Sequence, residues 1–269
     1  MKNLFFALAV AIVGLTSCDL EPTKVEPTPV EISYYSQYHY SQFVFNDVVS
    51  EALKYTKFWI ENPSEISDED GVKVSYSDEG NVLTIEYPAD LQKNPYKGKF
   101  KVIFNEKPMV WPLTDGASME IEPVDLTFNW MKIAGNVSVD ILEKGDAKAK
   151  LKIAVVGGKL TDRYNASIMY GCNLSREQKE GEDNKVDTDD TYTYTGTASG
   201  AFSNSISYSL GIDSEKPLIQ VNRSYYLKSG KVSVKLSTYA EPFTIEHGTT
   251  KYANEVLFTY KGVSKLYQI

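Results

Sequence analysis

Apolar and polar residues alternate along most of this 269-residue chain, in short stretches separated by turn residues. From Gly71 onward the period is two, as in VKVSY (72–76), VLTIEY (82–87), KVSVKL (231–236) and FTIEH (243–247). Such alternation predicts strands with one buried face and one face toward solvent. The sequence therefore predicts a mainly β fold of antiparallel sheets, sandwich-like or built from repeated sheet units.

Tight turns are expected where glycine-containing dipeptides separate two alternating stretches. These dipeptides are GN at 80–81, GG at 157–158 and SG at 229–230. The stretch from 177 to 190 (EQKEGEDNKVDTDD) is acidic and almost free of large apolar residues, so we expect a solvated loop there.

One segment near the N-terminus has a helical period instead. Phe45, Val49 and Ala52 follow the i, i+4, i+7 spacing of a buried helix face, and Pro63 lies beyond its end. The pattern predicts one N-terminal α-helix at about 42–60, with Trp59 packed on the sheet.

Four tyrosines crowd residues 34–40 (YYSQYHY), just before this helix. The segment is open to three interpretations: a first strand, a stacking surface, or the start of the domain. In a strand, Tyr34, Tyr38 and Tyr40 share one face, and we then expect them to pack against the helix or sheet. The chain has 19 tyrosines. Tyrosine favours half-buried sheet faces, whereas exposed tyrosines would also suit stacking on sugars.

The first 17 residues form a leader whose only charge is Lys2 and whose apolar run covers residues 4–13. A membrane span needs ~20 apolar residues, so this run fits a secretory signal peptide instead. Residues 15–18 (LTSC) resemble the lipobox of bacterial lipoproteins. That resemblance implies cleavage between Ser17 and Cys18, lipid attachment at Cys18, and attachment to the membrane through this N-terminal lipid.

Residues 18–32 follow the lipobox and hold three prolines, which disfavour both helix and sheet, so we expect an extended tether. The folded β-rich lipoprotein domain is then 33–269.

The net negative charge of the chain limits the partners that it is expected to bind. Removing residues 1–17 removes Lys2 alone and leaves 27 basic against 36 acidic residues. Binding to nucleic acid depends on neutralising phosphates, so an acidic chain is not expected to bind it. Electrostatic attraction to anionic lipids also needs clustered basic residues. We therefore expect the N-terminal lipid at Cys18 to supply the attachment to the membrane.

Two stretches of the chain are alike. When residues 72–88 are aligned with 232–248, Val72, Val74, Ser77 and the TIE motif at 84–86 recur. A third strand follows in each, which gives units at 72–104 and 232–260. If they are a duplication, the two units should superpose as the same strand arrangement.

These units also carry a family resemblance. The order is TIE (84–86), KGKFKV (97–102), LTFNWMKIAG (126–135), SGKV (229–232) and FTIEHG (243–248). It is similar to a family of uncharacterised β-rich surface lipoproteins of Bacteroidota type. This chain departs from the family where Gly-rich, Cys-bearing turns are replaced by PAD (88–90) and GTT (248–250). The resemblance implies a location and an architecture and no activity. In that family, acidic residues just after the lipidated cysteine favour display outside the cell, and Asp19 and Glu21 are a weak version of this pattern. The resemblance therefore implies a cell-envelope protein, in the outer rather than the inner membrane, with the leaflet left open.

Residues able to support catalysis or metal binding are few. Cys172 is expected to be a small buried residue. His39 and His247 are expected at the surface or at a sheet edge, with His247 and Glu246 on opposite faces of a strand. We find no motif for a nucleophilic enzyme or a phosphate-binding loop. The sequence thus predicts no catalytic, cofactor-binding or metal-binding residue.

The function indicated by the sequence is therefore a lipid-anchored cell-envelope lipoprotein with a non-catalytic binding or structural role. Its partner would be a polysaccharide or an envelope protein. One alternative is a carbohydrate-binding surface protein that uses exposed aromatic residues. A second is a secreted glycoside hydrolase, which would need two facing carboxylates, one with a raised pKa.

Overall fold

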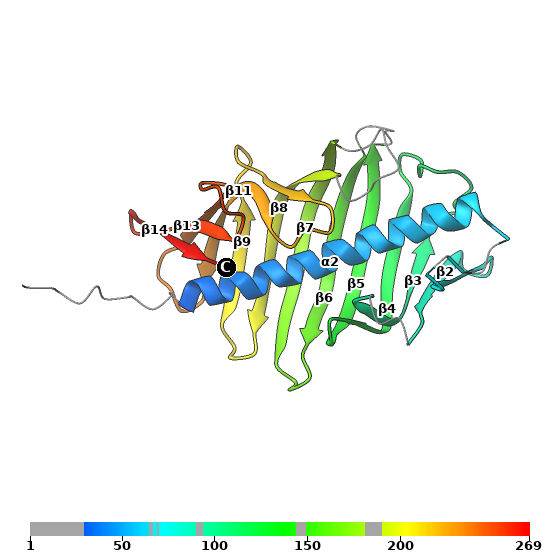
Figure 1. Ribbon diagram of the computed structural model, residues 1–269, viewed down its shortest axis with the longest axis horizontal. Helices are drawn as coiled ribbons and strands as arrows, with labels where there is room; N and C mark the ends of the chain where they lie inside the picture. Colours follow the sequence, from blue (N-terminus) through cyan, green and yellow to red (C-terminus); the bar gives the residue numbers. More distant parts are fainter. Residues whose placement is uncertain (1–29, 65–66, 69, 90–93, 144–148, 181–189) are drawn as a thin grey trace, which may run out of the picture.

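The computed structural model describes residues 30–64, 67–68, 70–89, 94–143, 149–180 and 190–269 (Figure 1). The expected signal peptide, Cys18 and most of the expected tether lie outside these residues. The described chain consists of one long helix laid across one face of a large antiparallel sheet.

Within the described residues, fourteen strands form a single sheet. The chain winds through it as a meander, with neighbouring strands antiparallel, and β9 alone lies off the main path, paired with β8 and β11. The strands are β1 (Lys73–Ser77), β2 (Val82–Tyr87), β3 (Tyr96–Phe104), β4 (Ser118–Phe128), β5 (Met131–Glu143), β6 (Lys150–Thr161), β7 (Ser167–Glu180), β8 (Thr191–Phe202), β9 (Ser207–Ile212), β10 (Leu218–Val221), β11 (Leu227–Leu236), β12 (Phe243–His247), β13 (Glu255–Tyr260) and β14 (Val263–Gln268).

This architecture confirms the predicted mainly β fold with one N-terminal helix. The strands form one continuous sheet rather than a sandwich of two sheets. Strand β7 runs to Glu180, so the first part of the stretch expected to be a loop, 177–190, is strand. The rest of that stretch, 181–189, lies outside the described residues.

The helix α2 (Val30–Glu61) is longer than predicted. It begins at Val30 rather than near residue 42, and so includes residues 30–32 of the expected tether and all of 34–40. The tyrosine-rich segment is therefore helical and not a strand. Tyr35 and Tyr38 are buried, because successive turns place them on the faces of the helix that the sheet covers. Tyr34 and Tyr40 are half-buried and pack on the same core.

The sheet curves around the helix. Glu51 of α2 accepts a hydrogen bond from Tyr87 of β2, and it pairs with Arg223 of the β10–β11 connection. Strands β2 and β10 are far apart in the sheet order, so both can reach one carboxylate only if the sheet bends toward the helix from both sides. At the C-terminal end of the helix, Trp59 stacks on Tyr76 of β1, which confirms its predicted packing on the sheet.

Of the three predicted turns, only GN at 80–81 is confirmed, with positive φ at Gly80 and Asn81. Dipeptide 157–158 lies inside β6 and 229–230 inside β11. At Gly158 an added Cβ would lie 2.4 Å from the carbonyl oxygen of Tyr170 and 2.9 Å from the ring of Phe45. This glycine therefore serves the close approach of helix and sheet rather than a turn.

The two similar units are both three-stranded antiparallel meanders, β1–β3 and β11–β13, near opposite ends of the sheet. Their registers differ: Val74 pairs with Ile85, but Val234, its counterpart, pairs with Phe243. Any three consecutive strands of a meander share this strand order, so the duplication stays a prediction. None of the described residues forms a helix long and apolar enough to cross a membrane.

Candidate functional site

Two hollows lined by described residues are large enough for a small molecule. One, of about 800 Å³, is a shallow groove over strands β6–β9 and β11. It is lined mostly by small residues such as Gly171, Ser199 and Ser209, and its ionisable lining residues are Cys172 and Lys235. The second, of about 640 Å³, combines aromatic rings with several charged groups. We call the second the aromatic pocket and treat it as the candidate site.

The aromatic pocket lies along one side of α2. The helix contributes Tyr40, Phe43, Asp47, Glu51 and Lys54. The other walls come from the segment before β1, the start of β3, the end of β4 with the β4–β5 turn, and the connection between β10 and β11. Residues lining these walls are Asp70, Asn94, Pro95, Tyr96, Phe128, Asn129, Arg223 and Tyr225.

Four aromatic rings of the pocket contact one another in a closed cycle. Phe43 meets Phe128 at 5.9 Å between centroids and Tyr225 at 5.7 Å, with interplanar angles of 71° and 86°. Tyr40 completes the cycle, at 6.5 Å from Phe128 and 6.3 Å from Tyr225. The two contacts of Phe43 are edge-on and those of Tyr40 are tilted by 56°, and inclined arrangements of this kind are favourable for aromatic pairs. They hold the four rings at an angle to one another around the pocket.

Asp47 is the carboxylate nearest these rings along the helix, one turn after Phe43. Its Oδ2 atom accepts a hydrogen bond of 2.7 Å from the hydroxyl of Tyr96. Burial raises the pKa of Asp47 to about 6, opposed by the Tyr96 hydrogen bond and reinforced by the charge of Glu51. A carboxyl group in this pocket is therefore partly protonated near neutral pH.

Glu51 follows one turn later and has both oxygens engaged. Arg223 pairs with its Oε1 atom at 2.8 Å, and the hydroxyl of Tyr87 donates to its Oε2 atom at 2.7 Å. Glu51 is 4% exposed. A carboxylate buried this deeply needs such partners, because leaving it unpaired would be strongly destabilising.

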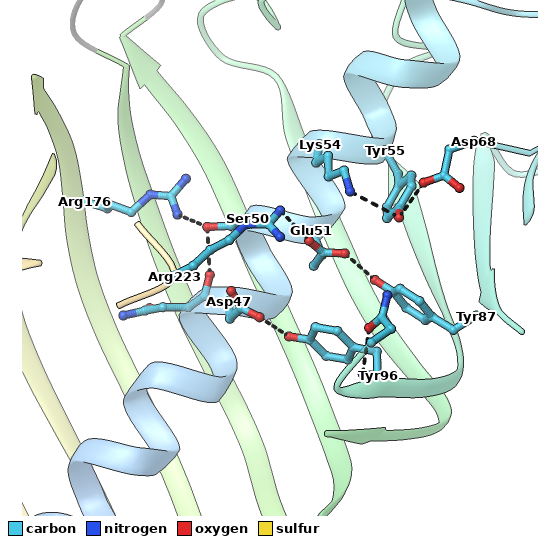
Figure 2. A network of polar contacts seen from close by, with 12 residues as sticks. Asp47, Ser50, Glu51, Lys54, Tyr55, Asp68, Tyr87, Tyr96, Arg176 and Arg223 are labelled. Atoms are coloured by element: carbon cyan, nitrogen blue, oxygen red, sulfur yellow. Dashed lines mark hydrogen bonds and ion pairs between the residues drawn. The ribbon is translucent and has the colours of Figure 1, made fainter. Parts of the chain in front are cut away.

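These groups belong to a longer polar network along α2 (Figure 2). Arg176 of β7 donates to the hydroxyl of Ser50 at 3.1 Å, and its guanidinium lies over the ring of Tyr192. Toward the end of the helix, the Tyr55 hydroxyl donates to Asp68 at 3.0 Å. The network ties the polar side of the helix to β2, β3, β7 and the β10–β11 connection.

The two histidines lie elsewhere, at the N-terminal half of α2, and their predicted exposure is wrong. His39 is 1% and His247 3% exposed, with ring centroids 5.9 Å apart. His39 donates from Nε2 to the carbonyl oxygen of Tyr225, and the Nε2 atom of His247 is 2.6 Å from the hydroxyl of Tyr35. The Nδ1 atoms of both rings are buried without a partner among the described residues. Glu246, as predicted, points to the opposite face, where it pairs with Lys216.

Cys172 is half-buried rather than fully buried, and it packs against the core from β7. Burial raises the pKa of its thiol. A thiol with a raised pKa is a poor nucleophile. This environment agrees with the expected structural role.

Sequence reasoning did not identify the aromatic pocket. Asp47 and Glu51 lie one turn apart on the helix, with Phe43 one turn and Tyr40 two turns before Asp47. This spacing indicates a common helix face. The residues that complete the pocket, Arg223 and Tyr225, come from a connection far along the chain. Their position depends on how the sheet curves.

Comparisons with protein-family models, curated proteins and solved structures find no match for this chain.

Proposed function

We propose that this protein is a lipid-anchored cell-envelope lipoprotein whose folded domain binds a small ligand in the aromatic pocket without transforming it. The proposal joins two independent observations. The N-terminal sequence supports an anchor at Cys18. The aromatic pocket supports binding, because it is an open space of about 640 Å³ with both apolar walls and polar groups.

The pocket is the observation that carries the binding role. Ligand sites are typically hollows of ≈ 300–1,000 Å³ with aromatic walls and a few placed polar groups. Tyr40, Phe43, Phe128 and Tyr225 supply such walls, and Asp47 supplies a carboxyl group. The ligand would be a free small molecule, or one unit of a polysaccharide.

The anchor is tested with Cys18→Ala in cells fed a labelled fatty acid. We expect labelled protein from the wild type and none from the variant, which should remain an uncleaved or mislocalised precursor. Normal labelling of Cys18→Ala would refute the lipobox assignment. A serine next to the site, Ser17, offers a control: Ser17→Ala should keep the label, since it retains a small residue before the cysteine.

Binding is tested on the full-length lipoprotein in non-ionic detergent, with a panel of sugars, amines and other small fragments followed by ligand-observed NMR. Compounds that bind the wild type should lose their signal with Tyr225→Ala. They should keep it with Trp130→Ala, which removes an 81% exposed ring outside the pocket. Binding that is indifferent to Tyr225 for every compound would place the ligand elsewhere and contradict the proposal.

A glycoside hydrolase is the second candidate, favoured by one observation. Asp47 and Glu51 are two carboxylates in one pocket, and the pKa of Asp47 is raised to about 6, as suits a general acid. Against it, both oxygens of Glu51 are engaged by Arg223 and Tyr87, which gives Glu51 a structural role. Release of reducing sugar from a glycan panel by the wild type, abolished by Asp47→Asn, would favour the hydrolase over the binding protein.

A further inference from the structure

We infer that the ligand of the aromatic pocket is an organic ammonium ion, held by the four rings of Tyr40, Phe43, Phe128 and Tyr225 with Asp47 as its counter-ion. The inference rests on the proposed binding function and names the chemistry that this pocket recognises. It is argued from the arrangement of the rings and from the charges around them.

The ring cycle has the dimensions of a cage for a cation. Its four sides measure 5.7–6.5 Å between centroids. When such a cycle is square, its centre is ~4 Å from each centroid, inside the ~6 Å within which a ring face attracts a cation. Alkyl-substituted ammonium ions suit such sites, because their charge is spread over an apolar surface that can leave water at low cost.

Two cationic side chains, Arg223 and Lys54, already line the pocket, and both lie close enough to Asp47 to lower the pKa of its carboxyl. Arg223 is paired with Glu51 at 2.8 Å. Lys54 lies near Tyr55, with its Nζ atom 3.4 Å from the hydroxyl and 4.7 Å from the ring centroid. Asp47 is held at one oxygen by Tyr96 and by no ion pair among the described residues. Asp47 and Asp70 are thus the carboxylates lining the pocket that form no ion pair among the described residues, and of the two it is Asp47 that lies on the helix one turn from Phe43.

The cost of burying Asp47 fits the same ligand. Burial favours the protonated carboxyl of Asp47 even though the charges of Arg223 and Lys54 oppose that rise of its pKa. An ammonium ion within a few ångströms would favour the carboxylate, so ligand binding and ionisation of Asp47 would support each other. A neutral sugar offers Asp47 hydrogen bonds but no such compensation of charge.

The test compares choline with its uncharged isostere 3,3-dimethylbutan-1-ol on the full-length lipoprotein in detergent, by isothermal titration calorimetry. We expect choline to bind at least roughly tenfold more tightly than the isostere, because several ring contacts and one carboxylate act on its charge. Phe43→Leu keeps an apolar wall but removes one ring, and should weaken choline binding by roughly fivefold. Asp47→Asn should weaken choline and leave the isostere unchanged. The control Trp130→Leu should change neither.

The outcomes separate the inference from the proposed function. If the isostere binds as well as choline, or if sugars bind and choline does not, the ammonium inference is wrong while the pocket remains a binding site. If neither probe nor any compound of the broader panel depends on Tyr225, both proposals fail. Thermal melts of Phe43→Leu and Asp47→Asn, required to match the wild type, exclude loss of folding as the reason for lost binding.

Discussion

Acid should destabilise this protein through the buried histidine pair. His39 and His247 have ring centroids 5.9 Å apart, and the neighbouring groups are the hydroxyl of Tyr35 and the backbone carbonyl of Tyr225. Burial lowers the pKa of His39 to about 4, opposed by the hydrogen bond to Tyr225. Burial and, secondarily, the charge of His39 lower the pKa of His247 to about 3. An unfolded histidine titrates near ~6.5.

The direction of the pH effect follows from the pH at which the folded and the unfolded state each bind protons. Between about pH 6.5 and 4 the unfolded chain takes up protons that the folded His39 and His247 refuse, so the free energy of unfolding falls as pH falls. Between pH 7 and 5 each histidine costs ~2 kcal/mol. Asp47 acts in the opposite direction, because its folded pKa of about 6 is above the unfolded value. Protonation of Asp47 raises the free energy of unfolding by ~1 kcal/mol between pH 7 and 5. The net decrease in the free energy of unfolding from these three groups is then ~2–3 kcal/mol.

The assay is urea unfolding at half-unit steps from pH 7.5 to 4.5, compared between the wild type and three variants. His39→Gln and His247→Gln should each make the stability less dependent on pH by ~2 kcal/mol between pH 7 and 5, whatever they do to stability at pH 7. Asp47→Asn should make the dependence steeper by ~1 kcal/mol, since it removes the opposing group. A wild-type stability that is flat or rises on acidification, with no change in either histidine variant, would refute the account.

Three further changes are predicted from packing. Gly158→Ala should destabilise the protein by ~1–3 kcal/mol in urea unfolding, because the added Cβ would overlap neighbouring atoms. Gly211→Ala, where a Cβ meets nothing within 4 Å, should be near neutral in the same measurement. Tyr38→Ala removes a fully buried ring and should cost ~3–5 kcal/mol, while Tyr164→Ala, at a 74% exposed position, should leave the melting temperature unchanged. Cys172 should react slowly with a water-soluble alkylating reagent in the native state and rapidly in urea, and equal rates would contradict its packed position.

The sequence was sufficient for the fold class because alternation of period two repeats over most of the chain and one helical period interrupts it. It was insufficient where local pattern and tertiary packing disagree. Residues 34–40 are rich in tyrosine, a strand-favouring residue, yet they are helical because they continue the buried faces of α2. Tyr35 and Tyr38 are covered there by strands that lie far along the chain, and no local pattern reports that coverage.

Two glycines show the same limit of prediction from local sequence. Gly157 and Gly158 have the composition of a turn, but they lie in the middle of β6, where the missing side chain admits Phe45 of the helix. The histidines were assigned to the surface because polar residues are usually exposed. The aromatic pocket was not predicted for a related reason. The spacing of its helix residues along the sequence indicates one helix face. The ring of Tyr225 reaches that face only because the sheet curves.

The contacts of α2 also constrain the order in which the protein can mature. The helix is synthesised first, yet its partners Arg223, Tyr225 and His247 are made last, 172, 186 and 212 residues after the helix residues they contact. Contacts this distant in sequence form slowly, because a long loop must close before they contribute. Until then these contacts are missing, and a chain truncated before β10 would lack both Tyr225, which His39 contacts, and His247, which Tyr35 contacts. A chain built this way therefore completes the packing of its first helix only after its last strands have been made.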